Sequence, residues 1–369
     1  MGLHIIPSDT KINFVGFRKT AYIISAVLLL AGLLSLVLRG GLSFGIDFAG
    51  GSVVQVQFDQ AISDEDVKNA LSGSDLPGLV VQSFGDDSTG YLLRISGQDA
   101  DAAVNVRSIV TQALDSNLPG QGYKIVRLEM VGPKVGADLR SKAMEALFLA
   151  TLLIAVYVSG RFEHRWTTAV IMAVVLGGGM YLLDLVGLGK AWQVLAAGLL
   201  TLVFCWKLKL AYALGAIVSI AHDLFLTVGI FSILGKEFDL TIIAALLTVV
   251  GYSLNDTIIV FDRIRENLQK DRKSPLGNLI NLSVNQTLSR TLLTSGTTLL
   301  VIVALLVLGG DIIFDFALAL LIGVVVGTYS SIFVASPILL FFEETIKARL
   351  KEDEENRKQI EKSKRMAQV

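Results

Sequence analysis

The sequence predicts a polytopic α-helical membrane protein that carries one α+β domain outside the membrane. Of its 369 residues, 53% are hydrophobic and only 18% are charged, whereas soluble domains average about 25% charged residues. The charges gather in segment 59–145, near 262–273 and after Glu343. The long stretches between them are almost free of charge, which is typical of a membrane protein with one polar insertion.

Apolar segments that can cross a hydrocarbon core about 30 Å thick recur along the chain. Eight are expected to span: 20–38, 143–160, 167–187, 191–206, 210–234, 240–261, 291–309 and 315–341. An even number of spans places both ends, 1–19 and the charged tail 343–369, on the same side. Lys and Arg concentrate in the connections on that side, after 160, after 206 and in the loop 262–290, which predicts that both termini are cytoplasmic.

Segment 42–134 lies between the first two spans, on the side opposite the termini, and predicts a folded domain. Val54, Val56 and Phe58 alternate with glutamines, which is the period of a strand, and Ser63 opens a helix-start pattern. Further strands are expected at 79–84, 90–95 and 123–131, with a second helix at 99–116. The order β-α-β-β-α-β predicts a ferredoxin-like sandwich. The segment has no His or Cys, so no metal site is expected there.

Asp256 lies inside the sixth expected span, where a carboxylate costs about 2.5–3.5 kcal/mol on the insertion scale. It must therefore face protein or water, and there it can gain or lose a proton as its surroundings change. The nearby residues able to hydrogen-bond to it are Tyr252, Ser253, Asn255 and Thr257. The residues alone leave two interpretations open: a proton carrier, or a permanently neutral acid that only packs helices.

Two further polar positions accompany this acid. Arg290 begins the seventh span in the same half of the bundle as Asp256, so the two can approach each other; alternatively, Arg290 anchors its span at the interface. His222 and Asp223 lie in the middle of another span. They suggest a proton pathway or, as the alternative, a polar clamp between helices.

Glycines mark both ends of the expected domain, in GIDFAGG (45–51) and GPKVG (132–136). Adjacent glycines allow a sharp turn or a close backbone approach. We expect a hinge that couples the domain to the spans, formed by Asp47, Gly50, Gly51, Gly132, Pro133 and Gly136. In the last span, Gly323 and Gly327 form a G-x-x-x-G, which predicts close helix packing.

Taken in order, these segments resemble the SecD/SecF family of protein translocase subunits, and its SecF branch in particular. The block GYSLNDTIIVFDRIREN (251–267) is the most specific part of the match. The other matching segments are GIDFAGG, GPKVG, RFE (161–163), AHD (221–223), NQTLSRTLLTSGTT (285–298) and IGVVVGTYSSIFVASPI (322–338). The stretch 167–206 departs from the family's usual six spans, because two inserted apolar runs predict an extra helical hairpin.

The resemblance implies one half of a resistance-nodulation-division type transporter in the bacterial inner membrane. It implies pairing with SecD, association with the Sec channel SecYEG and with YajC and YidC, and action on unfolded preproteins driven by the proton-motive force. Protons are then the coupling ion, and no other cofactor is expected. Asp256 matches the family's proton-carrying acid, Arg290 its basic partner, and His222–Asp223 a second motif.

Two other functions compete with this one: a proton-driven exporter of small molecules or lipids, and a membrane assembly factor that transports nothing. A single repeat with one small domain fits a half-unit with a partner better than a complete exporter. An enzyme is not expected, because the sequence shows no nucleophile–base set, metal-ligand spacing or phosphate-binding loop. A net charge of −1 provides no basic field for nucleic acid.

Overall fold

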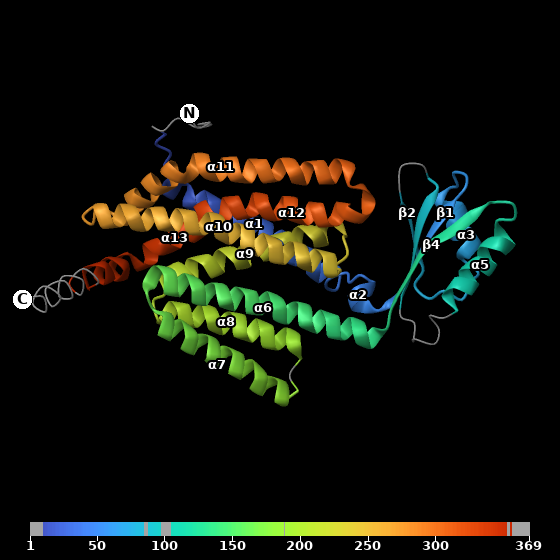
Figure 1. Cartoon of the computed structure of the whole chain (residues 1–369), viewed down its shortest axis with the longest axis horizontal. Coiled ribbons are helices and arrows are strands. Elements are labelled where there is room, and N and C mark those ends of the chain that lie inside the picture. Colours follow the sequence, from blue (N-terminus) through green and yellow to red (C-terminus); the bar gives the residue numbers. More distant parts are fainter. Residues whose placement is uncertain (1–9, 85–87, 97–104, 188, 353–354, 356–369) are drawn as a thin grey trace, which may run out of the picture.

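The computed structural model describes residues 10–84, 88–96, 105–187, 189–352 and 355. An elongated bundle of helices lies beside a small α/β domain (Figure 1). Parts of the expected termini (1–9 and 356–369) and the start of the expected helix 99–116 lie outside the described residues.

Helices occupy every position at which the sequence predicts an apolar span. They are α1 (Phe14–Leu38), α6 (Pro133–Glu163), α7 (Trp166–Leu185), α8 (Lys190–Lys207), α9 (Ala211–Leu234), α10 (Leu240–Lys270), α11 (Leu276–Leu308) and α12 (Gly310–Ser330). Among the described residues, seven helices are long and apolar enough to cross a membrane, and the apolar part of α8, Trp192–Lys207, is shorter. The chain is therefore a multi-pass membrane protein, while the eighth span stays a prediction.

Several helices extend beyond their apolar segments. The connection expected over 262–290 is reduced to 271–275, because α10 continues to Lys270 and α11 begins at Leu276. Apolar residues mark the part of a helix that lies in the membrane, and the helix itself can continue beyond them. Outside the membrane, ion pairs such as Arg263–Glu266, at 2.9 Å, stabilise the helix in water. After α12 the chain passes through a π-helical turn (Ser331–Ala335), α13 (Ser336–Ile338) and a 3-10 turn (Leu339–Phe342), and stays helical to Glu352.

The α/β domain (residues 51–131) has the expected β-α-β-β-α-β order and follows the short helix α2 (Ile46–Ala49). Its elements are β1 (Gly51–Phe58), α3 (Asp64–Leu71), β2 (Val80–Phe84), β3 (Gly90–Ser96), α5 (Val106–Asn117) and β4 (Tyr123–Val131). The strands form one antiparallel sheet in the order β2-β3-β1-β4, and α3 and α5 cover one face (Figure 1). Ser63 caps α3 as predicted, since its Oγ accepts a hydrogen bond from Asp66 N at 3.1 Å.

The centre of the bundle is α9, which packs against α1, α6, α10 and α12. Its sequence is apolar all round, and most of its side chains are buried against these neighbours. Close approach between α12 and α10 depends on glycine, because a Cβ atom at Gly327 would lie only 2.9 Å from Ser253 Cβ. The close packing predicted from the G-x-x-x-G is thus confirmed, and it brings polar side chains of neighbouring helices into hydrogen-bond range.

The inserted stretch 167–206 forms α7 and α8, which pack against each other and against α6 (Figure 1). Their outward side chains are largely apolar and exposed, as at Val174, Leu182 and Trp192. The predicted helical hairpin is therefore present, and it lies at the edge of the bundle.

Candidate functional site

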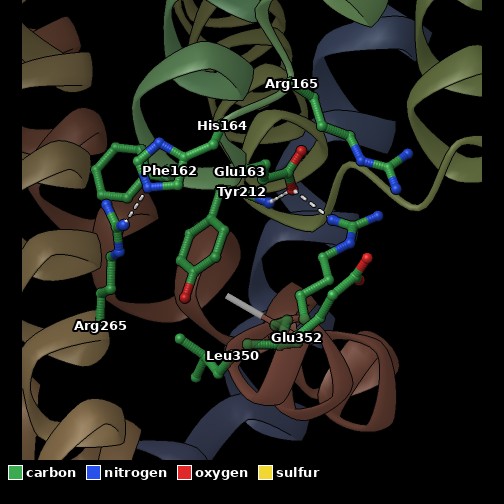
Figure 2. A pocket seen from close by; sticks show the side chains of 10 residues that line it. Phe162, Glu163, His164, Arg165, Tyr212, Arg265, Leu350 and Glu352 are labelled. Carbon is green, nitrogen blue, oxygen red and sulfur yellow. Dashed lines mark hydrogen bonds and ion pairs between the residues drawn. The ribbon is translucent and has the colours of Figure 1, made fainter. Parts of the chain in front are cut away.

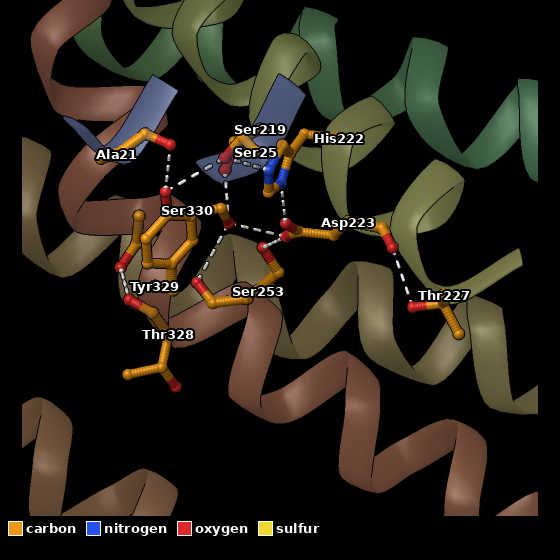
Figure 3. A network of polar contacts seen from close by, with 12 residues as sticks. Ala21, Ser25, Ser219, His222, Asp223, Thr227, Ser253, Thr328, Tyr329 and Ser330 are labelled. Atoms are coloured by element: carbon orange, nitrogen blue, oxygen red, sulfur yellow. Dashed lines mark hydrogen bonds and ion pairs between the residues drawn. The ribbon is translucent and has the colours of Figure 1, made fainter. Parts of the chain in front are cut away.

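Asp223 lies in the middle of α9 with only 1% of its surface exposed, and both of its carboxylate oxygens have partners (Figure 3). Its Oδ1 lies 2.9 Å from Nδ1 of His222. Its Oδ2 accepts hydrogen bonds from Ser253 Oγ of α10 at 2.6 Å and from Ser330 Oγ of α12 at 2.8 Å. Both oxygens of this carboxylate thus have hydrogen-bond partners, as buried polar groups generally do, and we call such a fully partnered group saturated.

The network around Asp223 extends to a fourth helix (Figure 3). Nε2 of His222 lies 2.9 Å from Ser25 Oγ of α1, and that Oγ lies 3.0 Å from the hydroxyl of Tyr329. Tyr329 donates a hydrogen bond to the carbonyl oxygen of Ala21 at 2.7 Å. These linked groups tie α1, α9, α10 and α12 together, and they can also pass protons, so the geometry is compatible with both roles considered for this pair.

Asp256 of α10 is equally buried, with 1% of its surface exposed, but its carboxylate is only half satisfied. Oδ2 accepts one long hydrogen bond, 3.3 Å, from Ser295 Oγ of α11, which itself lies 2.8 Å from Thr328 Oγ1 of α12. Among the described residues, Oδ1 has no hydrogen-bond partner, and neither has the buried hydroxyl of Thr291, one turn before Ser295. An unpaired buried acceptor already costs about 1–3 kcal/mol of stability. The carboxyl of Asp256 can therefore bind or release a proton, or change its hydrogen-bond partner, at little further cost in free energy.

Arg290 of α11 is exposed and lines a cavity of about 460 Å³ between α6, α10 and α11. Asn255, the residue before Asp256, lines the same cavity. A second arginine of the cavity, Arg161, is already paired with Asp262 at 2.5 Å. In the described part of the chain no ion pair joins Arg290 to Asp256. The predicted ion pair between Arg290 and Asp256 is therefore not formed in this structure.

The polar neighbours expected around Asp256 in the sequence do not bond to it. Tyr252 hydrogen-bonds to α11, Ser253 belongs to the network of the other acid, and Asn255 faces the cavity. Thr257 is buried on α10. The structure differs from the expectation because adjacent residues of a helix point in different directions, so a buried side chain is supported from facing helices.

The expected hinge residues meet where the α/β domain joins the bundle. Gly50, with a φ angle of 77°, joins α2 to β1, and Gly51, with a φ angle of 140°, is the first residue of β1. A Cβ atom at Gly50 would lie 2.8 Å from Pro133 Cα, and one at Gly136 would lie 3.1 Å from Gly50 N. Gly132 is the N-cap of α6. The chain thus enters and leaves the domain through one crossing that has no room for a side chain at Gly50.

Asp47 connects this crossing to α10. Its Oδ2 accepts a hydrogen bond from Leu240 N, the first residue of α10, at 3.0 Å. An acid is also favoured there by the positive end of the helix dipole. The hinge therefore contacts the same helix that carries Asp256.

A second cavity, of about 220 Å³, lies where α6 and α9 meet the C-terminal helical segment (Figure 2). Glu163 Oε1 accepts a hydrogen bond from Tyr212 N at 3.0 Å and lies 3.8 Å from Arg349 Nη1. Beside it, Arg265 Nη2 lies 2.7 Å from Nε2 of His164. Sequence reasoning missed Glu163, although it belongs to the RFE segment. The side chain caps α9 and contacts the C-terminal segment.

Within the residues that the structure describes, no three His, Cys, Asp or Glu side chains group so as to hold a metal ion. The single cysteine, Cys205, is buried and free. The chemistry that this arrangement offers is the binding, release and relay of protons by buried carboxyl, imidazole and hydroxyl groups.

Comparison with known families matches two models to this chain. The model "Protein export membrane protein SecD/SecF, C-terminal" covers residues 111–177 and 188–345, and the "SecD/SecF GG Motif" covers 37–62. A protein translocase subunit SecF of Magnetococcus marinus is 44% identical over 344 residues, which is 92% of this chain and 95% of the relative. A SecF of Desulfurispirillum indicum is 38% identical over 336 residues, 90% of this chain and 91% of the relative.

Two solved structures are also similar. The translocon-associated membrane protein SecDF of Thermus thermophilus is 31% identical, with a TM-score of 0.64 over 93% of this chain. SecDF in its "super-membrane-facing form" is 30% identical, with a TM-score of 0.54 over 94% of this chain. This chain spans 40% of the length of each of those chains.

Proposed function

Because the chain belongs to the SecD/SecF family of protein export membrane proteins and is an accessory subunit of the Sec protein translocase, we propose that it works with SecD as half of a proton-driven transporter. The proton-motive force across the bacterial inner membrane then promotes the translocation and release of preproteins at the outer face. Both termini lie in the cytoplasm and the α/β domain, a ferredoxin-like fold, lies in the periplasm. SecYEG, and with it YajC and YidC, are the further partners.

The observation that carries this proposal is the half-satisfied carboxyl of Asp256, which follows Asn255 on α10, together with the open cavity that Asn255 and Arg290 line. When ionised, the carboxylate attracts the guanidinium across this gap; when protonated, it loses that attraction and keeps only its bond to Ser295. The contact between α10 and α11 thus depends on one proton. A proton crossing about 100 mV supplies about 2.3 kcal/mol, which is enough to bias such a contact.

Asp223 has the complementary role in this proposal. Its bonds to α10 and α12, with those of His222 to α1, hold the helices in register while α10 and α11 change their contact. Ser253 and Asp256 lie three residues apart on α10, and therefore on neighbouring parts of one face. The saturated network therefore lies next to the carboxyl that changes, on the same helix.

The partner half docks, in this proposal, on the open face of α10. Ala244, Thr248, Gly251 and Asn255 recur there at helical spacing and are exposed. Nothing lies within 4 Å of a Cβ atom built at Gly251. Small and polar residues at this spacing are typical of contacts between helices within a membrane. A helix of SecD on this face encloses the cavity that Asn255 and Arg290 line.

Replacement of Asp256 by Asn tests the proposal, because the amide keeps the size of the side chain and cannot ionise. In inverted membrane vesicles containing SecD and the channel, we expect the stimulation of preprotein translocation by the proton-motive force to be lost. Translocation driven by ATP alone should continue.

Asp184→Asn is the matched control. That acid lies on α7, and its side chain is 51% exposed and paired with Lys190, so its replacement should leave the stimulation at the wild-type level. Full stimulation in Asp256→Asn vesicles would remove this residue from the mechanism.

A further inference from the structure

The α/β domain touches the bundle at a point separate from its hinge. Arg94 of β3 forms an ion pair with Glu237, in the short connection between α9 and α10. Within the described residues, this is the only ion pair between the domain and the helical bundle. Sequence reasoning assigned no role to either side chain.

The connection that carries Glu237 is held firmly to the bundle. Phe238 N donates a hydrogen bond to Ser43 O at 2.8 Å, and Gly45 N donates one to Phe238 O at 2.8 Å. These bonds pair the connection with the segment between α1 and α2. The connection also joins the helix of Asp223 to the helix of Asp256. A shift of α9 or α10 therefore moves Glu237.

The covalent links of the domain to the bundle are, by contrast, made at glycines. The chain enters at Gly50–Gly51 and leaves at Gly132, and glycine permits backbone angles that other residues avoid. Both links lie at β1 and β4. Arg94 lies on β3, across β1 from β4 in the sheet order β2-β3-β1-β4. The ion pair is thus set to one side of the hinge, where it opposes rotation of the domain.

We propose that Arg94 and Glu237 are positioning residues of the transport cycle and form a latch that sets the angle of the α/β domain on the bundle. The inference rests on the proposed function, in that the latch opens when α10 shifts with the state of Asp256. Their side chains are 27% and 38% exposed, and ion pairs in contact with water are only weakly stabilised. The latch therefore opens reversibly.

The first experiment measures the angle itself, without transport. Spin labels are placed on Ser116 of α5 and on Leu308 at the end of α11, both exposed, in the full-length protein with SecD in nanodiscs. We expect a single narrow distance distribution for the wild type and a broad one for Glu237→Arg. The double exchange Arg94→Glu/Glu237→Arg should restore the narrow distribution.

The matched control is the ion pair Lys236–Asp315, which joins the same connection to α12 within the bundle at 2.6 Å. Lys236→Glu should leave the distance distribution unchanged. A narrow distribution in Glu237→Arg, or broadening to the same extent in Lys236→Glu, overturns the latch whatever the role of Asp256.

The second experiment links the latch to transport. Cysteines replace Arg94 and Glu237 in a Cys205→Ala background, and a reducible thiol crosslinker joins them. We expect the crosslinked complex to lose stimulation by the proton-motive force, and a reductant to restore it. Stimulation at the wild-type level in the crosslinked complex overturns the proposal. If crosslinking blocks transport while Asp256→Asn does not, the latch stands and the proton role of Asp256 fails.

Discussion

Asp223 and Asp256 are the same residue type at the same degree of burial, yet their surroundings differ. The carboxylate of Asp223 contacts His222 and accepts hydrogen bonds from Ser253 and Ser330. The carboxylate of Asp256 accepts one long hydrogen bond and leaves an oxygen without a partner among the described residues. Burial alone therefore does not identify a switching acid, and the number of donors aimed at it separates a fixed group from a changeable one.

This difference predicts unequal losses of stability, and the largest is expected at Asp223. Asp223→Ala leaves an imidazole and two hydroxyls buried without their acceptor, and breaking such a buried network costs about 3–5 kcal/mol. Asp256→Ala removes one weak bond together with an unpaired oxygen, so we expect a loss below about 1 kcal/mol. The free energy of unfolding in detergent is measured for both variants and for the wild type. Equal losses would show that the two acids are held alike.

A smaller effect separates the serines that serve the two acids. Ser253→Ala takes one of the donors from Asp223 and should lower the free energy of unfolding by about 1–2 kcal/mol. Ser295→Ala should lower it by less, because its bond to Asp256 is 3.3 Å long and Thr328, which it also contacts at 2.8 Å, keeps its own bond to Val324 O.

The same pair of variants also separates stability from transport. Ser295→Ala should reduce the stimulation of export by the proton-motive force severalfold, because it removes the one donor that positions Asp256. Ser253→Ala should reduce export only as far as it reduces the amount of folded protein. A larger loss of stability in Ser295→Ala than in Ser253→Ala would contradict this assignment.

Sequence reasoning singled out both acids and the glycine crossing at Gly50 but could not assign their partners. Asp256 stands out because a carboxyl in an apolar span is costly, and Gly50 because adjacent glycines are informative by themselves. The bond between Ser253 and Asp223 depends on how α9, α10 and α12 face each other, which no local pattern records. Arg94 and Glu237 escaped notice for the same reason, since charged residues outside the membrane are common until a fold pairs them.

A comparably small effect is expected in the α/β domain, where the side chain of Tyr91 is buried and its hydroxyl is fully hydrogen-bonded. Its hydroxyl donates to Ile62 O at 2.5 Å and lies 3.1 Å from Asp64 Oδ1. Burial, and then the hydrogen bond to Asp64, raise the pKa of Tyr91 from 10.0 to about 12. Since the folded pKa lies above the unfolded one, the stabilisation is complete below pH 10 and is lost as the pH rises to about 12.

Tyr91→Phe tests this by removing both the bond and the titration. We expect a loss of about 1 kcal/mol at neutral pH, which shrinks as the pH rises, because the wild type loses its advantage while the variant has none to lose at this position. Denaturant unfolding of the two proteins, followed by near-ultraviolet circular dichroism at each pH, gives the difference and cancels the other tyrosines. If the difference in free energy of unfolding stayed constant up to pH 12, the pKa of Tyr91 would be the same in the folded and unfolded chains. Burial and hydrogen bonding would then not hold the proton on the Tyr91 hydroxyl.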